Sequence, residues 1–403
     1  MNIVIKVFSA DIIAKIITTF TTIILIRYMS DYDYATYTVF VAIANIYNQI
    51  AISSFGKMYI VDYKFFYEKE YTLLLMEVAL SVLVGYIFLF IQPVTKSNYL
   101  LLFFLMVSTC IFGYVRVIYQ QQCKFKLYTI VEMLRVLSFF VLIVGCYEII
   151  NVDLMATHVL SFQIVSLLIP VVFINEAWSK INIVKKLEFK SIFRYLLQKE
   201  QWCLLIYSSL MAVLLQIDVL ALKTWGTNYN VSTYASAFKY YGMMLLLLNT
   251  VNSVLLPKIS SEDNYIKINK MYKQQDILSV FLLVGIIAAI VIAPYVLPII
   301  DGGKYPEAID VFRILCVSAF ISFWGSPYNN ILIKEKKFLG LCVRFIFSIM
   351  VAVVGNYFMI PMFDVDGTAI ITLVSYGIVN LSSRVQAKKI IKEKVKEAMP
   401  NAN

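Results

Sequence analysis

The segment LSVFLLVGIIAAIVIAPYVLPI, residues 278–299, contains no charged side chain along its whole length. A transmembrane helix needs about 20 consecutive, predominantly apolar residues to cross the hydrocarbon core of a bilayer. Pro294 and Pro298 lie within the segment, where neighbouring helices can satisfy the carbonyl groups that proline leaves free. This stretch therefore predicts one complete membrane crossing.

The rest of the chain has a similar composition. Of its 403 residues, 61% are hydrophobic and only 15% are charged, and the mean hydropathy is +0.78. A water-soluble chain of this length could not bury so many apolar side chains. We therefore expect a multi-pass protein that is not an enzyme, because short loops leave no room for a sizeable soluble domain.

Apolar runs bounded by charged or turn-forming clusters recur along the sequence and predict an all-α membrane protein with about twelve transmembrane helices. The runs are 9–28, 35–56, 72–92, 98–119, 128–147, 154–174, 201–223, 231–256, 278–299, 306–332, 339–361 and 365–383. The longest polar interruption separates the first six from the last six. The predicted organisation is an N-terminal six-helix lobe (1–175), a cytoplasmic linker (176–200), a C-terminal six-helix lobe (201–384) and a basic cytoplasmic tail (385–403), with a central cavity between the lobes.

Lysine and arginine alternate between the loops in the way that sets membrane orientation. With a cytoplasmic N-terminus, the outer side receives only Arg27, Lys96, Lys223 and Lys304, and nearly all other basic residues outside the helices fall on the inner side. Both termini are therefore predicted to be cytoplasmic. The net charge of +10 is explained by this asymmetry, and we expect no nucleic-acid partner.

No motif indicates a metal, a cofactor or ATP hydrolysis. The six cysteines are scattered and have no histidine near them, so neither a zinc site nor a disulfide framework is indicated. No GxxxxGK[ST] phosphate loop occurs. The first hydrophobic stretch lacks a small-residue cleavage site, so we expect a retained helix there. Transport would draw on an ion gradient or on the gradient of the substrate.

Basic residues inside the predicted helices are the main functional clue, because an ionisable side chain at membrane depth usually faces a protein interior or a watery cavity. We predict that five of them line the cavity and bind an anionic group such as a pyrophosphate. They are Lys15, Arg135, Lys239, Arg313 and Arg344. Two alternatives stay open: Lys15 and Arg135 form local ion pairs with Asp11 and Glu132, and Arg344 extends to the interface.

Buried acids are candidates for coupling transport to an ion. Asp218 and Lys239 lie at similar depths in consecutive predicted helices, so a carboxylate that exchanges a lysine partner for a proton would link proton entry to a conformational change. A static ion pair is the alternative. Glu77 is the second candidate for this coupling role.

Amide side chains on several predicted helices suit either sugar hydroxyls or hydrogen bonds between helices. They are Asn45, Asn48, Gln49, Gln163, Gln216, Asn249 and Asn252.

Two junctions resemble each other and also resemble a known family. IRYMSDYDYATYTVF (26–40) is similar to ALKTWGTNYNVSTYASAF (221–238), with Tyr37 and Tyr234 at matching places, which suggests parallel repeats. Both segments, together with LPIIDGGKYPEAIDVFRIL (297–315), resemble polysaccharide-repeat (O-antigen type) flippases of the multidrug/oligosaccharidyl-lipid/polysaccharide exporter superfamily. The resemblance extends over the whole chain, although Ala35-Thr36 stands where the family usually has a glycine.

The resemblance implies an alternating-access flippase in the bacterial cytoplasmic (inner) membrane. Its substrate would be an undecaprenyl-pyrophosphate-linked oligosaccharide, moved from the inner to the outer leaflet by antiport in O-antigen or lipopolysaccharide biosynthesis. Expected partners are membrane lipid, a polysaccharide polymerase and a chain-length regulator. The alternative is a multidrug cation exporter of the same superfamily, which an excess of buried Lys and Arg fits poorly.

Overall fold

The computed structural model describes residues 2–61, 63–66, 69–91, 96–122, 124–149, 153–173 and 187–398. Every regular element within these ranges is a helix, and eight of the helices are long and apolar enough to cross a membrane. The prediction of an all-helical membrane protein is confirmed at this level. Residues 176–186 of the predicted linker and 399–403 of the predicted tail lie outside the described residues.

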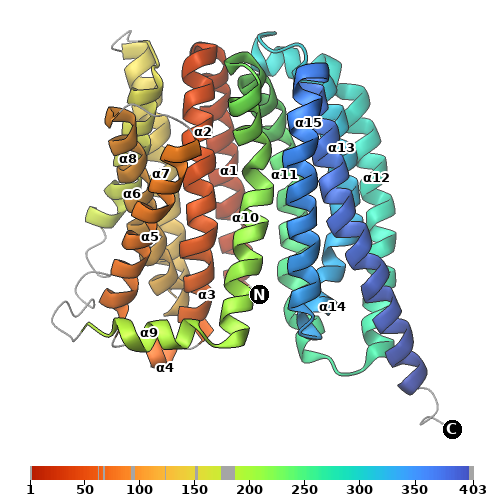
Figure 1. Cartoon of the computed structure of the whole chain (residues 1–403). Coiled ribbons are helices and arrows are strands. Elements are labelled where there is room, and N and C mark those ends of the chain that lie inside the picture. Colours follow the sequence, from red (N-terminus) through yellow and green to blue (C-terminus); the bar gives the residue numbers. More distant parts are fainter. Residues whose placement is uncertain are drawn as a thin grey trace. The chain divides into compact units, whose positions relative to one another are not determined.

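The chain forms two compact units, Met1–Ala212 and Val213–Asn403, so the division falls inside helix α10. Figure 1 labels the helices of both units. The first unit contains α1 (Asn2–Tyr28), α2 (Asp31–Asn48), η1 (Gln49–Ser53), α3 (Ser54–Val61), α4 (Tyr63–Phe66), α5 (Glu70–Ile91), α6 (Lys96–Gln121), α7 (Phe125–Val144), η2 (Gly145–Ile149), α8 (Ala156–Phe173), α9 (Phe189–Leu196) and the beginning of α10 (Lys199–Trp225).

Helix α6 is central to the first unit, because it packs against α2, α3, α5, α7 and α8, while α7 also packs against α1. Aromatic and hydroxyl side chains fix these contacts. The Tyr47 hydroxyl of α2 donates a 2.8 Å hydrogen bond to the main-chain carbonyl of Glu77 in α5. Burying a polar group without a hydrogen-bond partner costs free energy, so such bonds fix how each helix is rotated about its axis relative to its neighbour.

The second unit is built around α13. Its elements are α11 (Asn228–Ser261), α12 (Tyr265–Asp301), α13 (Ala308–Gly325), η4 (Ser326–Tyr328), α14 (Asn329–Lys334) and α15 (Phe338–Ala398). Helix α13 packs against α11, α12 and α15. A Cβ placed on Gly325 would lie 2.6 Å from the main-chain oxygen of Asn380, so only glycine permits the close approach of α13 and α15 here.

Helix α15 contains the break that the sequence places between 361 and 365. Asp364 has φ +48° and ψ −129° within the otherwise helical run, three residues after Pro361. Beyond the break the helix continues to Ala398 and includes most of the basic tail that the sequence predicts from 385. This segment is helical because KKIIKEKVKEA consists mainly of good helix formers and Ile391 is buried.

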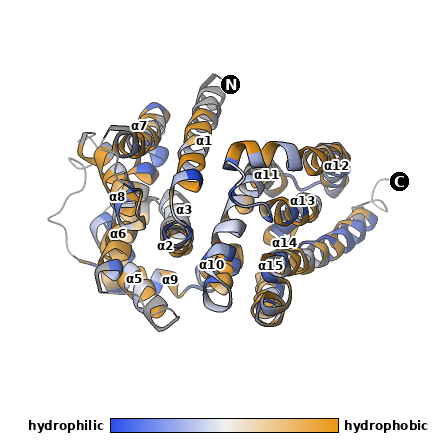
Figure 2. Cartoon of the chain, turned by 90° about the horizontal axis from the view of Figure 1, so that it is seen from above, coloured by the Kyte–Doolittle hydropathy of each residue, from blue (hydrophilic) through white to orange (hydrophobic). Residues whose placement is uncertain are grey.

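Large apolar side chains are exposed on the outer surfaces of both units. Val172 is 73% exposed in the first unit, and Phe281, Tyr295 and Ile299 are 71–73% exposed along α12. Figure 2 shows hydrophobic colour along these helices and hydrophilic colour along the last turns of α15. Exposed apolar surface on this scale, on helices of membrane-spanning length, indicates contact with lipid.

The two similar junctions have the same capping geometry. Ser30 caps α2 by accepting a hydrogen bond from the main-chain amide of Asp33, and Thr227 caps α11 by accepting one from that of Asn230. Each capping hydroxyl also donates a 2.5 Å hydrogen bond to the side chain of that same third residue. In both helices the cap binds the main-chain amide of the third residue after it, which has no partner within the helix. This shared geometry supports the internal repeat.

Candidate functional site

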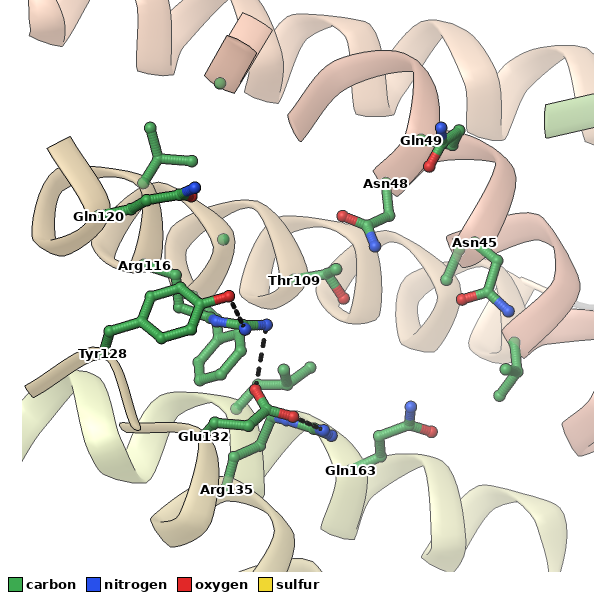
Figure 3. Close-up of a pocket in the computed structure, with 17 residues that line it drawn as sticks. Asn45, Asn48, Gln49, Thr109, Arg116, Gln120, Tyr128, Glu132, Arg135 and Gln163 are labelled. Atoms are coloured by element: carbon green, nitrogen blue, oxygen red, sulfur yellow. Dashed lines mark hydrogen bonds and ion pairs between the residues drawn. The ribbon is translucent and has the colours of Figure 1, made fainter. Parts of the chain in front are cut away.

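A cavity of about 530 Å³ lies inside the first unit, between α2, α6, α7 and α8. Figure 3 shows its polar side chains gathered around the cavity. They are Asn45, Asn48, Gln49, Thr109, Arg116, Gln120, Tyr128, Glu132, Arg135 and Gln163. This density of polar groups is unusual for a membrane-embedded unit and marks the cavity as the candidate site.

Two arginines and one glutamate form the charged centre of this cavity. Arg116 Nη1 lies 3.1 Å from Glu132 Oε2, and Arg135 Nη2 lies 2.5 Å from Glu132 Oε1. Arg116 also donates a hydrogen bond to the Tyr128 hydroxyl, and its guanidinium lies 4.4 Å from the centre of that ring. The side chains of Arg116 and Arg135 remain 28% and 23% exposed, so both are accessible from the cavity.

The charge balance of the cluster is positive, since two guanidinium groups face one carboxylate. Lys15 of α1 is close enough to Glu132 and Arg135 to interact with both electrostatically. The structure therefore brings two of the five predicted cations, Lys15 and Arg135, to one place. A guanidinium group can donate two parallel hydrogen bonds to the oxygens of one phosphate. The cluster therefore has suitable donors for a phosphate or pyrophosphate.

Arg116 is the residue that sequence reasoning missed. The count of basic residues assigned it to a cytoplasmic loop, because it is close to the predicted helix end and precedes a polar run. In the structure it lies within α6 and lines the cavity. The signal that could have found it is the helical spacing from Thr109, Phe112 and Gly113, which lie on the same face.

Amide groups cover the cavity wall next to the arginines. Asn45 and Asn48 come from α2 and Gln49 from the π-helical turn η1, a helix irregularity that often occurs at functional sites. The Gln163 Oε1 atom is buried and has no hydrogen-bond partner among the described residues. Amides that both donate and accept suit sugar hydroxyls.

Glu77 does not line this cavity. It is 2% exposed in α5, and the Cys110 thiol of α6 donates a 3.3 Å hydrogen bond to its Oε2 atom. Its predicted coupling role stays a prediction.

Asp218 is buried in the second unit in a cluster of neutral donors. Thr372 and Tyr234 donate hydrogen bonds of 2.8 and 2.9 Å to its Oδ2 atom, and Asn356 Nδ2 lies 3.3 Å from Oδ1. Asp218 belongs to α10, and its partners come from α11 and from both halves of α15. The carboxylate is thus surrounded by hydroxyl and amide groups, whereas sequence reasoning favoured Lys239 as its partner.

Lys239 interacts instead with a different carboxylate. Its charge is attracted by Asp301 at the end of α12, and Asp301 also accepts hydrogen bonds from Ser236 (2.5 Å) and Tyr240 (2.6 Å) of α11. The predicted ion pair with Asp218 is therefore replaced by this second cluster.

The remaining two predicted cations lie apart from each other. Arg313 makes a 2.8 Å ion pair with Asp310 one turn earlier in α13, where both side chains are exposed. Arg344 donates a hydrogen bond to Gln386, which lies beyond the break in α15. Within the second unit, Lys239, Arg313 and Arg344 form no common cluster.

Comparison with known proteins gives matches at the level of structure alone. No model of a protein family matches the sequence, and no curated protein is similar in sequence. The lipid II flippase MurJ in an inward closed conformation superposes with a TM-score of 0.73 at 12% identity, covering 98% of this chain and 91% of MurJ. An inward-facing multidrug resistance MATE transporter of the MOP superfamily gives 0.67 at 13% identity, covering 95% and 96%.

The chain has the fold of the MOP superfamily transporters. A further MOP transporter, from Pyrococcus furiosus Vc1 (DSM3638), matches with a TM-score of 0.60 at 12% identity over 96% of this chain and 93% of its own length, and is described as having a binding pocket of reverse polarity that suggests a different function. Together with the eight apolar helices, this fold indicates a multi-pass membrane protein.

Proposed function

We propose that this chain is a flippase that moves an undecaprenyl-pyrophosphate-linked oligosaccharide from the inner to the outer leaflet of a bacterial cytoplasmic membrane. The observation that carries the proposal is the pairing of Arg116 and Arg135 around Glu132 in a cavity lined with amides. The guanidinium groups suit the pyrophosphate, and the amides suit the sugars attached to it.

The size of the cavity supports a polar headgroup as its occupant. A volume of about 530 Å³ falls within the roughly 300–1,000 Å³ range of small-molecule sites, which is enough for the pyrophosphate and the first sugar. The fold of the lipid II flippase adds support, since that protein also handles a lipid-linked substrate. A polysaccharide polymerase and a chain-length regulator remain the partners that we propose for the product.

The membrane arrangement that goes with this function has twelve crossings in two six-helix lobes with cytoplasmic termini. Each of the twelve predicted apolar ranges overlaps one or more helices of the structure, and the basic residues favour this orientation. Alternating access driven by an ion gradient, with Asp218 as the coupling group, completes the proposal. The domain limits at 175, 200 and 384 stay predictions.

A multidrug cation exporter is the second candidate, because MATE transporters have the same fold. The charge of the cavity argues against it, since two arginines and the nearby Lys15 outweigh Glu132. A positive cavity repels a cationic drug and attracts an anionic headgroup.

The proposal is tested by reconstituting the full chain in proteoliposomes with a fluorescent polyprenyl-pyrophosphate-linked saccharide. Arg116→Gln and Arg135→Gln are each expected to lower substrate affinity about tenfold or more, because a charge-assisted hydrogen bond contributes about 1.5–3 kcal/mol. The matched control is Arg194→Gln, an exposed arginine of α9 in the same unit that does not line the cavity.

Two results would contradict the proposal. One is translocation by both cavity variants at the wild-type rate. The other is saturable export of a cationic dye that the lipid-linked saccharide does not inhibit, which would favour the drug exporter.

A further inference from the structure

A second cavity, of about 480 Å³, lies inside the second unit between the beginning of α12 and the end of α15. Its lining is strongly basic. It consists of Asn269, Tyr272, Lys273, Asp276, Tyr328, Lys388, Ile391, Lys392, Val395 and Lys396. The proposed function makes no use of this cavity.

The base of the cavity is a fixed polar cluster around Asp276. Arg384 binds this carboxylate through both nitrogens, at 2.7 and 3.0 Å, and the Tyr328 hydroxyl lies 3.2 Å from each carboxylate oxygen. The Arg384 side chain is only 8% exposed, and it stacks on the Trp324 ring at 3.9 Å. Tyr272 stacks on Tyr328 at 4.4 Å. These contacts within the protein preorganise the base of the cavity.

Arg384 neutralises Asp276, so the four lining lysines are left in excess. Lys388 reaches Asp276 at 3.2 Å, whereas Lys273, Lys392 and Lys396 make no ion pair with the part of the chain that the structure describes. Glu397 is not among the lining residues and pairs with Lys394 at 3.6 Å. The cavity thus offers several ammonium groups to a multivalent anion.

The regular spacing of these lysines keeps them on one side of α15. Lys388, Lys392 and Lys396 follow one another at intervals of four residues, which places them on one helical face. On α12, Lys273 and Asp276 are three residues apart and share the facing side. Two helices therefore present one continuous basic surface.

The position along α12 places this surface at the boundary of the membrane. Asp276 is the last charged residue before an uncharged run from Ile277 to Ile300, which is long enough to cross the bilayer. Lysines and arginines are concentrated at this end of the unit, where the sequence predicts the cytoplasmic side. Basic pockets between helices at this level commonly bind anionic lipid headgroups.

Apolar surface continues from the cavity along the same face of α12. Val280 follows Asp276 by four residues and Val284 follows by eight, and these side chains are 61% and 65% exposed. An acyl chain attached to a phosphate in the cavity would lie along them. A free inorganic anion would gain nothing from this row, so the apolar continuation favours a lipid.

We propose that the cavity between α12 and α15 binds the phosphate headgroup of an anionic phospholipid from the adjacent leaflet, with the acyl chains against Val280 and Val284. The lipid would tie the end of α15 to the beginning of α12. The proposal is independent of what the chain transports.

The test is native mass spectrometry of the full chain in detergent, titrated with phosphatidylglycerol or with zwitterionic phosphatidylcholine. Wild-type protein is expected to retain phosphatidylglycerol preferentially. The Lys392→Gln/Lys396→Gln variant is expected to lose about thirtyfold in affinity for it, which corresponds to about 2 kcal/mol.

The matched control is Lys389→Gln/Lys394→Gln, which removes the same charge from the same helix at exposed positions that do not line the cavity. This control is expected to bind like wild type. A Lys392→Arg/Lys396→Arg variant retains the charge and is expected to keep the affinity. Thermal unfolding without added lipid checks that every variant is folded.

Competition experiments separate the possible sources of the phosphate. Inorganic phosphate and pyrophosphate are expected to leave the bound phosphatidylglycerol in place. Displacement by inorganic pyrophosphate at equal concentration would assign the cavity to a free anion, and selective displacement by polyprenyl diphosphate would assign it to the lipid carrier. Either result overturns the proposal, as does an equal loss of affinity in the two glutamine double variants.

Discussion

The Thr372 hydroxyl of α15 donates a 2.8 Å hydrogen bond to the Asp218 carboxylate of α10 across 154 positions of sequence. Tyr234 and Asn356 bind the same carboxylate. A buried carboxylate that binds a proton or a metal cation loses its negative charge. This loss weakens the hydrogen bonds that it accepts from α11 and α15. This linkage is the physical basis of the coupling role proposed for Asp218.

Asp218→Asn tests the charge while leaving the packing intact. The amide is nearly isosteric, and the Asn356 Oδ1 atom, which is buried without a partner among the described residues, can accept from the new amide group. We expect the variant to fold, but transport driven by an imposed proton or sodium gradient should fall between about 5- and 150-fold, the usual range of coupling between sites. Flux in proteoliposomes with and without the gradient measures this.

The control is Asp301→Asn, which removes another buried carboxylate of the same unit that Ser236 and Tyr240 bind. Gradient dependence should survive in this variant. Unchanged gradient dependence in Asp218→Asn would refute the coupling role, and equal losses in both variants would indicate a structural effect.

Glu132→Gln tests two roles of the carboxylate separately: its effect on the affinity of the cavity for anions and its contribution to stability. Among the described residues that line the first cavity, Glu132 is the only one with a carboxylate, so its removal leaves Arg116 and Arg135 available to an anion. We expect a pyrophosphate-bearing lipid analogue to bind more tightly, and the unfolding free energy to fall by about 1–3 kcal/mol because two charge-assisted bonds weaken. Calorimetric titration and thermal unfolding give the two quantities. Weaker binding would show that Glu132 serves mainly to position the arginines.

Gly325→Ala should destabilise the second unit. The added methyl group would meet the main-chain oxygen, carbonyl carbon and Cβ of Asn380 at 2.6–2.8 Å, and a backbone cannot yield as a flexible side chain does. We expect a loss of about 1–3 kcal/mol, read from thermal unfolding in detergent. Gly285→Ala in α12 is the control, because no atom lies within 4 Å of its added Cβ. Equal stability of the two variants would contradict the close approach of α13 and α15.

Sequence reasoning located the helices because apolar runs of membrane length leave few alternatives. Two helices extend beyond the predicted crossings: α12 begins at Tyr265 and α15 ends at Ala398. Hydropathy identifies the part of a helix that lies in hydrocarbon. The charged extension is stabilised by the helix propensity of its residues and by contacts such as the ion pair of Arg384 with Asp276.

The partners of buried charges were harder to predict, because depth alone leaves the rotation of a helix undetermined. Tyr234 faces Asp218, and Lys239, five residues later, lies about 140° further around α11 at 3.6 residues per turn. Lys239 therefore faces Asp301. Arg135 was found because its partner Glu132 is three residues away on the same helix, a relation that the sequence displays directly.

The orientation of the chain gives a last prediction that is independent of any substrate. Pro306 lies in an exposed turn before α13, and Lys389 is exposed near the end of α15, at the opposite end of the apolar part of the second unit. With cytoplasmic termini, a membrane-impermeant maleimide should label Pro306→Cys in intact spheroplasts and Lys389→Cys only after permeabilisation. Wild-type protein is the background control, because Cys203 is partly exposed whereas Cys110, Cys146, Cys316 and Cys342 are buried. The opposite labelling pattern would invert the orientation, and with it the proposed direction of lipid movement.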